Sequence, residues 1–378
     1  MRGTNVSSVK VISPPWTAQS TTKEDCTFQQ LAPYIGRIKP SIARDIVERF
    51  TQAGDLVVDP FAGSGVIPFE AALLGREVLA TDISPYGVLL MRAKFTAPLD
   101  CDNALSRFAA RWKAAQRRVA RQDLRRVPNW VRKFFHPETL RNALALRDEL
   151  VDREEYFLLA CLLGILHHQR PGFLSHPSSH LVPYLRDKLF PPACFPDMYK
   201  ERDVKTRMEA KIRRAYRRPP VTLANARICL ADARSLPRPR QIDAVVTSPP
   251  YMNELDYVRD NRLRIWFLER QLPPIEDIRR RDREAQFRRL LRDTFTRLIG
   301  RLVPGASVIL IVGDTSRGQR RLDAAQSVRS LFSEKDFKCL KPQEEIWDKI
   351  PNIRRSRRDL RGTKKETILR YVATQDCA

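Results

Sequence analysis

The feature that most constrains the fold is residues 56–82, where a strand, a glycine-rich turn, a helix and a second strand follow one another closely. Leu56-Val57-Val58 is an apolar run typical of a buried strand, and it leads into the turn Asp59–Gly65. A helical pattern over residues 67–74 ends at Gly75, and the strand pattern of residues 77–81 ends at Asp82. A strand–helix–strand order with short connections predicts neighbouring parallel strands. We therefore expect an α/β protein.

The rest of the chain divides into two kinds of sequence. Strand patterns return at residues 227–230, 242–247 and 307–312, whereas residues 100–166 read as successive helices and residues 169–222 as irregular. The domain boundaries that we infer are a loose N-terminal arm over 1–26, an α/β core over 27–99 and 223–378, and a mainly helical insertion over 100–222.

The charge balance indicates the class of partner. Lys and Arg total 68 against 44 Asp and Glu, which gives a formal net charge of +24. Basic side chains that neutralise phosphates release counterions, so this surplus favours a nucleic acid as partner. Seven scattered cysteines without a CxxC pair are typical of reduced thiols, and from the sequence we expect neither a signal peptide nor a membrane-spanning run. We expect a cytoplasmic protein with no membrane partner.

The turn Asp59-Pro60-Phe61-Ala62-Gly63-Ser64-Gly65 has the character of a cofactor loop. Glycines let the backbone approach a ligand, and free amides at the start of the next helix can face a carboxylate. Asp82 ends the following strand at a spacing suited to binding ribose hydroxyls, and Asp232 ends a third strand. The third glycine of the dinucleotide fingerprint is missing, which disfavours a nicotinamide cofactor.

The run DPFAGSG resembles the S-adenosyl-L-methionine loop of amino-methyltransferases that act on nucleic acids. The resemblance implies a Rossmann-like, seven-stranded class I methyltransferase sheet with an antiparallel last strand. It assigns the cofactor's amino group to Asp59, its ribose to Asp82 and its adenine to Asp232. The upstream segment 34–40 resembles a further cofactor motif more loosely. The cofactor-binding residues implied are Asp59, Phe61, Ala62, Gly63, Gly65, Asp82, Ile83, Asp232 and Ala233.

The strand 242–247 ends in Ser248-Pro249-Pro250-Tyr251, which we interpret as the catalytic loop. Two prolines stiffen the loop and remove backbone donors, so its carbonyls are free to accept. The Ser248 hydroxyl and the Pro249 carbonyl are suitable acceptors for an exocyclic amine, and Tyr251 offers a face on which a base can stack. Such a base must be flipped out of its duplex, at a cost of a few kcal/mol.

SPPY resembles the catalytic motif of bacterial DNA amino-methyltransferases, and its serine is similar to the cytosine-N4 enzymes. The predicted function is methyl transfer from S-adenosyl-L-methionine to N4 of cytosine at a specific DNA site. Three alternatives stay open: an adenine-N6 DNA methyltransferase, a tRNA or RNA guanine-N2 methyltransferase, and a non-catalytic DNA-binding protein with this fold. Glu254 and Asp256 are candidate proton acceptors just beyond the loop.

Arginine-rich segments are the candidate DNA-binding residues, and the insertion is the candidate target-recognition region. Double-stranded DNA is the expected partner, with a cognate restriction endonuclease as a further partner that the resemblance allows. The histidines of the insertion and the nearby cysteines match no common zinc spacing, so we expect no metal and interpret these histidines as packing or DNA contacts. The arginines assigned to DNA are Arg213, Arg214, Arg217, Arg354, Arg355, Arg357 and Arg358.

Overall fold

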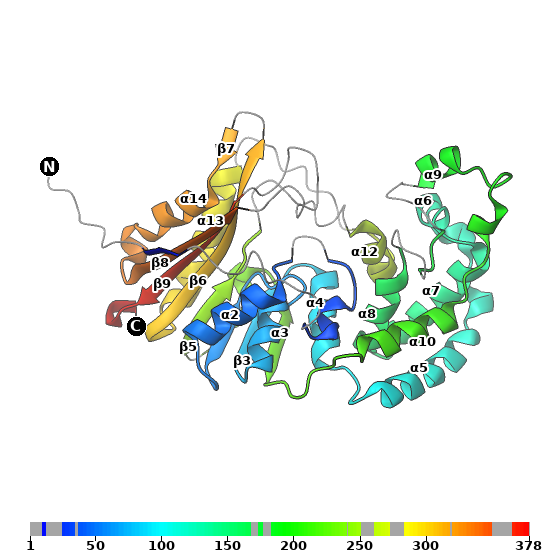
Figure 1. Ribbon diagram of the computed structural model, residues 1–378, viewed down its shortest axis with the longest axis horizontal. Coiled ribbons are helices and arrows are strands. Elements are labelled where there is room, and N and C mark those ends of the chain that lie inside the picture. The colour runs from blue at the N-terminus through cyan, green and yellow to red at the C-terminus, as the bar shows by residue number, and fades with distance from the viewer. Residues whose placement is uncertain are drawn as a thin grey trace.

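A computed structural model describes residues 10–12, 25–34, 37–167, 173–176, 183–239, 241–250, 261–272, 283–317, 320–349 and 365–377. A mixed β-sheet with helices on both faces forms one side of the molecule, and a group of helices forms the other (Figure 1).

Within the described residues the sheet has nine strands, and its order along the main path is β1-β8-β9-β6-β5-β2-β3-β4. All neighbouring pairs on this path are parallel except those of β9, which runs antiparallel to both β6 and β8. The strands are β1 (Lys10–Ile12), β2 (Leu56–Asp59), β3 (Glu77–Asp82), β4 (Ala226–Leu230), β5 (Ile242–Thr247), β6 (Leu302–Arg317), β7 (Arg320–Leu322), β8 (Leu340–Lys349) and β9 (Lys365–Ala373).

The run β4-β3-β2-β5-β6-β9-β8 is the expected Rossmann-like, seven-stranded class I methyltransferase sheet with an antiparallel last strand. Two strands add to it: β1 pairs in parallel with β8 at the edge, and β7 pairs with β6. The expectation that residues 1–26 form only a loose arm is therefore wrong for Lys10–Ile12, a three-residue run too short for its β-pattern to stand out.

Helices cover both faces because successive strand residues point in opposite directions. Val57 packs in the cluster formed with α2 (Pro40–Phe50), α3 (Val66–Leu73) and α4 (Pro85–Phe95). Its neighbour Val58 packs in the cluster formed with α13 (Arg283–Ile299) and α14 (Ala324–Phe332) on the other face. The same alternation separates Val246 from Val245 in β5.

The helical insertion packs against the outer side of α4 (Figure 1). Its apolar core also takes in the short 3-10 helix η1 (Thr27–Gln30), through Phe28, and α12 (Arg262–Glu269), through Phe267. The helices of the insertion are α5 (Cys101–Gln116), α6 (Asn129–Arg132), α7 (Pro137–Asp152), α8 (Tyr156–Ile165), α9 (Pro183–Leu189) and α10 (Val204–Ala215).

The prediction that residues 169–222 are irregular is wrong for α10 and α9. In α10, Asp203 caps the helix by accepting from the Thr206 amide at 2.6 Å. Val204, Met208 and Ile212 are buried at a spacing of four residues and form its apolar face. That spacing is present in the sequence, but the surrounding Lys and Arg residues make it hard to recognise.

The interpretation of all seven cysteines as reduced thiols is also wrong. Cys339, just before β8, and Cys377, just after β9, form a disulfide with a Cα–Cα distance of 5.3 Å. The two are 38 residues apart in sequence, and they meet because Leu340 pairs with Ala373 in the antiparallel ladder. Within the described residues, no helix has the length and apolar character needed to cross a membrane.

Candidate active site

The site lies at the point in the sheet where successive strands of the chain stop being added on one side of β2 and begin to be added on the other. From β2 the chain builds outward through β3 to β4, and it then returns to the other side of β2 to place β5 and β6. Ligands of open α/β sheets bind outside the carboxyl ends of the strands at this switch point. Asp59 ends β2 and Thr247 ends β5, and the Thr247 hydroxyl donates to Asp59 Oδ1 at 2.6 Å. The loop after β2 and the loop after β5 therefore start from one hydrogen-bonded pair.

The carboxyl group of Asp59 is almost completely buried. It is 1% exposed, and its burial raises the pKa to about 7, although hydrogen bonds from Thr247 and from the Phe61 amide oppose the rise. Both of these donors are neutral, and the Phe61 amide lies 3.1 Å from Oδ1. A buried carboxylate is costly unless a cation pairs with it. A ligand ammonium at this position would supply that charge.

Asp82 is oriented by two backbone amides. Its Oδ2 accepts from Gly63 at 2.7 Å, and its Oδ1 accepts from Ser84 at 2.8 Å. Burial raises the pKa of Asp82, and these two hydrogen bonds oppose the rise. A carboxylate has about four acceptor positions, so lone pairs stay available for the hydroxyls of a ribose. The hydrogen bond to Gly63 also ties the end of β3 to the glycine-rich loop.

The glycine-rich loop needs its glycines for both conformation and space. Gly63 and Gly65 have φ values of +54° and +74°, in the left-handed region that side chains disfavour. A Cβ on Gly63 would lie 3.3 Å from the Tyr34 ring, and one on Gly65 would lie 2.3 Å from Met91 Cγ. Within the loop, the buried Ser64 hydroxyl has no hydrogen-bond partner among the described residues. This orphaned polar atom and the close-packed glycines fit a loop that cradles a ligand.

Beside Asp82, the side chain of Ile83 is 70% exposed. A large apolar side chain in this position offers a surface on which an adenine ring can pack. Asp232, which follows β4, lies in the neighbouring loop but is differently engaged: Arg234 forms an ion pair with it at 2.7 Å and lowers its pKa. Ala233 is buried.

The remaining loop residues that we assigned to the cofactor follow Asp59 directly. The half-buried Phe61 packs against the cluster that faces α13, and Ala62 is buried in the opposite cluster. The Ala62 amide donates to the Thr81 carbonyl at 3.0 Å. The loop is thus fixed to β3 through both its backbone and Asp82.

In the loop predicted to be catalytic, Ser248 donates its hydroxyl hydrogen to the Ile311 carbonyl of β6 at 3.2 Å. Its oxygen lone pairs are then directed to accept, as the predicted role requires. Pro249 is buried and Pro250 is partly buried. Tyr251, Glu254 and Asp256 lie outside the described residues.

The candidate DNA-binding arginines that the structure describes do not lie at the carboxyl edge of the sheet. Arg213, Arg214 and Arg217 are exposed at the end of α10. The Tyr216 hydroxyl beside them donates to Pro98 O at 2.6 Å, just beyond the end of α4, which places this group near the amino edge of the sheet. Arg354, Arg355, Arg357 and Arg358 lie outside the described residues.

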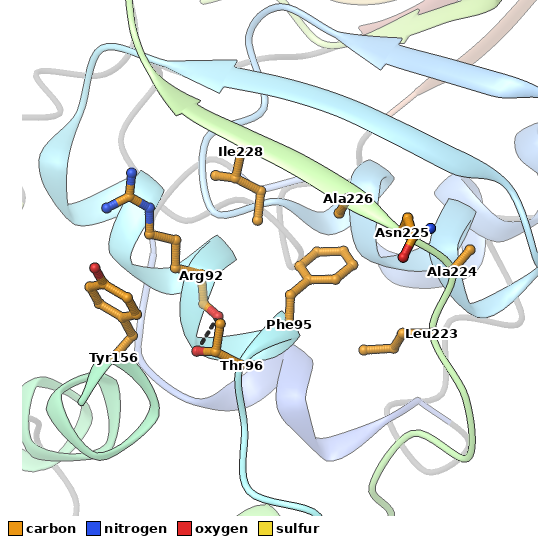
Figure 2. A pocket seen from close by; sticks show the side chains of 9 residues that line it. All are labelled: Arg92, Phe95, Thr96, Tyr156, Leu223, Ala224, Asn225, Ala226 and Ile228. Atoms are coloured by element: carbon orange, nitrogen blue, oxygen red, sulfur yellow. Dashed lines mark hydrogen bonds between the residues drawn. The ribbon is translucent and has the colours of Figure 1, made fainter. Parts of the chain in front are cut away.

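A hollow of about 450 Å³ lies near this amino edge, between α4 and the start of β4 (Figure 2). The Phe95 ring lies under the strand, and Arg92 lies beside Tyr156. Because β4 begins here and the cofactor loop follows the far ends of the strands, this hollow is separate from the site described above.

The histidines of the insertion take part in packing. His167 lies 2.8 Å from the Ser175 hydroxyl, and the His176 ring packs on Tyr199 at 4.9 Å between centroids. His168 and His180 lie outside the described residues. Within the described ranges, no group of three or more His, Cys, Asp or Glu side chains is arranged to hold a metal ion.

Sequence reasoning missed several residues that support the site. Thr247 ties Asp59 to β5, Lys94 and Gln29 lie beneath the glycine-rich loop, and Gly87 allows α4 to approach Gly63. A Cβ on Gly87 would lie 2.6 Å from the Gly63 carbonyl oxygen. The one local signal was a glycine in the first turn of a helix, where it has an intrinsic cost.

Residues 10–91 match the N6_N4_Mtase family model, which is described as DNA methylase. This segment holds β2, the glycine-rich loop and Asp82, so the resemblance to DNA amino-methyltransferases is confirmed for the cofactor half of the site. S-adenosyl-L-methionine is the cofactor that this match implies for the loop. The SPPY motif lies outside the matched residues.

Similarity to a curated protein is confined to a short segment. The Type II methyltransferase M.MjaII from Methanocaldococcus jannaschii is 32% identical over 62 residues, which is 16% of this chain and 12% of that protein. The chain therefore matches only a small part of this relative's length.

Solved structures resemble the chain only weakly. TrmN from Thermus thermophilus is 13% identical with a TM-score of 0.36, over 92% of this chain and 52% of that chain. The rRNA methyltransferase aviRa from Streptomyces viridochromogenes is 13% identical with a TM-score of 0.35, over 95% of this chain and 97% of that chain. At these scores neither structure bears on the substrate.

Proposed function

We propose that this protein transfers a methyl group from S-adenosyl-L-methionine to the exocyclic amine of a flipped-out DNA base, with N4 of cytosine as the acceptor. The observation that carries the proposal is the hydrogen bond between Thr247 and Asp59. It joins the acid of the cofactor loop to the strand that leads into Ser248-Pro249-Pro250, so a methyl donor and an amine would meet at one point.

The residues of the cofactor half would bind and orient. Asp59 would accept from the ammonium of the methionine moiety, Asp82 would accept from the ribose hydroxyls, and Ile83 would pack against the adenine. Asp232 would contact the adenine while it keeps its ion pair with Arg234. The bound cofactor supplies an electrophilic methyl group on a sulfonium.

The residues of the catalytic loop would activate the amine. Ser248 Oγ and the Pro249 carbonyl would each accept one N–H, which holds the nitrogen in place and increases its electron density. Ser248 is suited to this role because its own hydrogen is donated to Ile311. Tyr251 would stack on the base. The nitrogen would take the methyl in line as the sulfur–methyl bond breaks, leaving S-adenosyl-L-homocysteine. The extra proton on the nitrogen would pass to water or to one of the candidate acceptors, Glu254 and Asp256.

The expected partner is double-stranded DNA, and the net charge of +24 supports it. We propose a cytoplasmic place of action, where the DNA and a cognate restriction endonuclease would be found. The insertion is the proposed target-recognition region. The exposed arginines at the end of α10 would then contact phosphates at a distance from the flipped base.

The test is transfer of label from S-adenosyl-L-methionine to mixed genomic DNA, followed by mass spectrometry of the nucleosides. N4-methylcytosine is the expected product. N6-methyladenine would keep the mechanism but overturn the assignment of Ser248 to cytosine. Label on RNA alone, as guanine-N2 methylation, would overturn the DNA substrate, and binding of DNA without binding of S-adenosyl-L-methionine would leave a non-catalytic DNA-binding protein.

A further inference from the structure

A buried lysine lies directly beneath the glycine-rich loop, and no step proposed above uses it. Lys94, in the last turn of α4, is 3% exposed. Its Nζ donates to the Ser64 carbonyl at 2.8 Å, to the Gly65 carbonyl at 3.2 Å and to Gln29 Oε1 at 2.7 Å. An ammonium has three N–H donors, so these three acceptors use all of them.

Further polar groups hold the lysine's partner in place. Gln29 donates from its amide nitrogen to Glu70 Oε1 at 2.8 Å, and Glu70 accepts from Arg44 at 2.9 Å through its other oxygen. Glu70 is fully buried on α3, the helix that begins at the loop. This chain of contacts therefore joins η1, α2, α3 and α4 below the loop.

One face of α4 contacts the loop along its whole length. Gly87 lies against the Gly63 carbonyl, Met91 lies against Gly65, and Lys94 binds the carbonyls of Ser64 and Gly65. Positions 87, 91 and 94 are spaced four and three residues apart, so they share one side of the helix. Two of these contacts are steric and limit where the loop can move. Of these three α4 residues, Lys94 is the one that holds the loop by hydrogen bonds.

We propose that Lys94 is a positioning residue that fixes the glycine-rich loop in the conformation that binds S-adenosyl-L-methionine. The proposal rests on the proposed function of the loop. Without the ammonium, the Ser64 carbonyl loses its donor and the Gly65 carbonyl keeps only the Phe69 amide at 3.3 Å. The left-handed conformation at Gly65 then loses a contact that stabilises it from below. The loop would then sample other conformations, and cofactor affinity would fall.

The cost of keeping this group supports a specific role. Burial, together with the nearby Arg37, lowers the pKa of Lys94 to about 7, although Glu70 and Cys26 oppose the change. Arg44 and Asp25 are the other charged groups of the same cluster. An apolar side chain would avoid this penalty but would leave the Ser64 carbonyl unpaired.

The chain contains a matched control. Lys211 of α10 is also buried, at 6% exposed, and burial lowers its pKa to about 8. Its Nζ donates to a backbone carbonyl, that of Gln30, at 2.9 Å. No contact of Lys211 involves residues 59–65 among those the structure gives. Lys94→Met and Lys211→Met therefore remove the same group from equally buried places, one under the loop and one in the insertion.

The experiment measures the Kd of S-adenosyl-L-methionine by calorimetry for the wild type and both variants, with the Tm of each. We expect both variants to lower the Tm, and only Lys94→Met to weaken cofactor binding, by about tenfold or more. In turnover assays the KM for the cofactor should rise in Lys94→Met, while the KM for DNA stays unchanged. A Kd within twofold of the wild type in Lys94→Met, or an equal loss in Lys211→Met, would overturn the proposal.

Two further results separate this proposal from that of the protein's function. A wild-type protein that does not bind S-adenosyl-L-methionine would overturn the function itself, whatever the variants do. If Lys94→Met does not fold, Gln29→Met keeps the lysine and removes one of its three acceptors. It should weaken cofactor binding by about threefold, and an unchanged Kd in that variant would equally count against the role of Lys94.

Discussion

The carboxyl edge of the sheet and the helical insertion are stabilised by different kinds of contact. At the sheet edge, short polar contacts fix individual atoms: Asp82 is held by two amides, and Asp59 by a hydroxyl and an amide. The insertion has an extended apolar core, and ion pairs such as those of Glu155 lie at its margin. The difference indicates that polar contacts fix the atoms that the proposed chemistry would use. In the insertion, packing keeps the helices together as a support.

The largest effect is expected for a substitution at the sheet edge, at Asp59. Asp59→Asn keeps an acceptor for Thr247 and Phe61 but removes the negative charge that would pair with the cofactor's ammonium. Because hydrogen bonds to charged groups contribute about 1.5–3 kcal/mol, we expect cofactor affinity to fall by about 10- to 100-fold. Calorimetric titration with S-adenosyl-L-methionine measures this. Unchanged affinity would show that Asp59 does not bind the ammonium.

The wild type and the same variant should differ in how their stability depends on pH. The folded pKa of Asp59, about 7, lies above its ordinary value of 3.8. Between these values the folded protein binds a proton that the unfolded chain has lost, so the free energy of unfolding falls as pH rises. Asp59→Asn lacks this loss. Its Tm relative to wild type should increase between pH 4 and pH 8 without cofactor, and a constant difference would contradict the buried-carboxyl interpretation.

In the insertion, Glu155→Gln should affect stability alone. Glu155 is 6% exposed, and it accepts from Arg107 at 3.1 Å and from Arg111 at 2.8 Å. Because both arginines are partly exposed and can be solvated, the loss of unfolding free energy should be about 1–2 kcal/mol. Denaturant titration gives this value. An accompanying loss of cofactor affinity would mean that the two regions are not independent.

Ser248→Ala tests whether the two loops at the sheet edge have separate roles. It removes one acceptor for the amine and leaves the cofactor loop intact, so kcat should fall about tenfold while the Kd of the cofactor stays the same. A tenfold change corresponds to about 1.4 kcal/mol, which lies within the range of a neutral hydrogen bond. Single-turnover methylation measures the rate. A full rate in this variant would remove the proposed role of Ser248.

The smallest effect is expected for Asp232→Asn. Its carboxylate is partly exposed and paired with Arg234, so its contact with the adenine competes with an existing partner. We expect cofactor affinity to fall by about threefold or less, measured beside Asp59→Asn in the same buffer. A loss as large as that of Asp59→Asn would show that the three acids act alike.

Features that depend on local sequence patterns were predicted, whereas those that depend on contacts between distant residues were missed. The strands around Asp59 and Asp82 were predictable because apolar runs and glycine turns are local patterns. The hydrogen bond from Thr247 to Asp59 spans 188 residues and depends on the strand order, which no local pattern contains. The pairing of Cys339 with Cys377 and that of β1 with β8 were missed for the same reason. The helix α10 was missed for another reason, because basic residues stand between the apolar residues that form its buried face.

The shared core of the insertion has a consequence for protein engineering. Phe28 of η1 and Leu89 of α4 belong to the same apolar cluster as α5, α7, α8 and α10. Exchange of residues 100–222 alone between two related proteins would therefore leave mismatched surfaces on both sides of the junction. A chimera meant to carry a new sequence specificity should bring its own η1 and its own outer face of α4 with the transplanted helices.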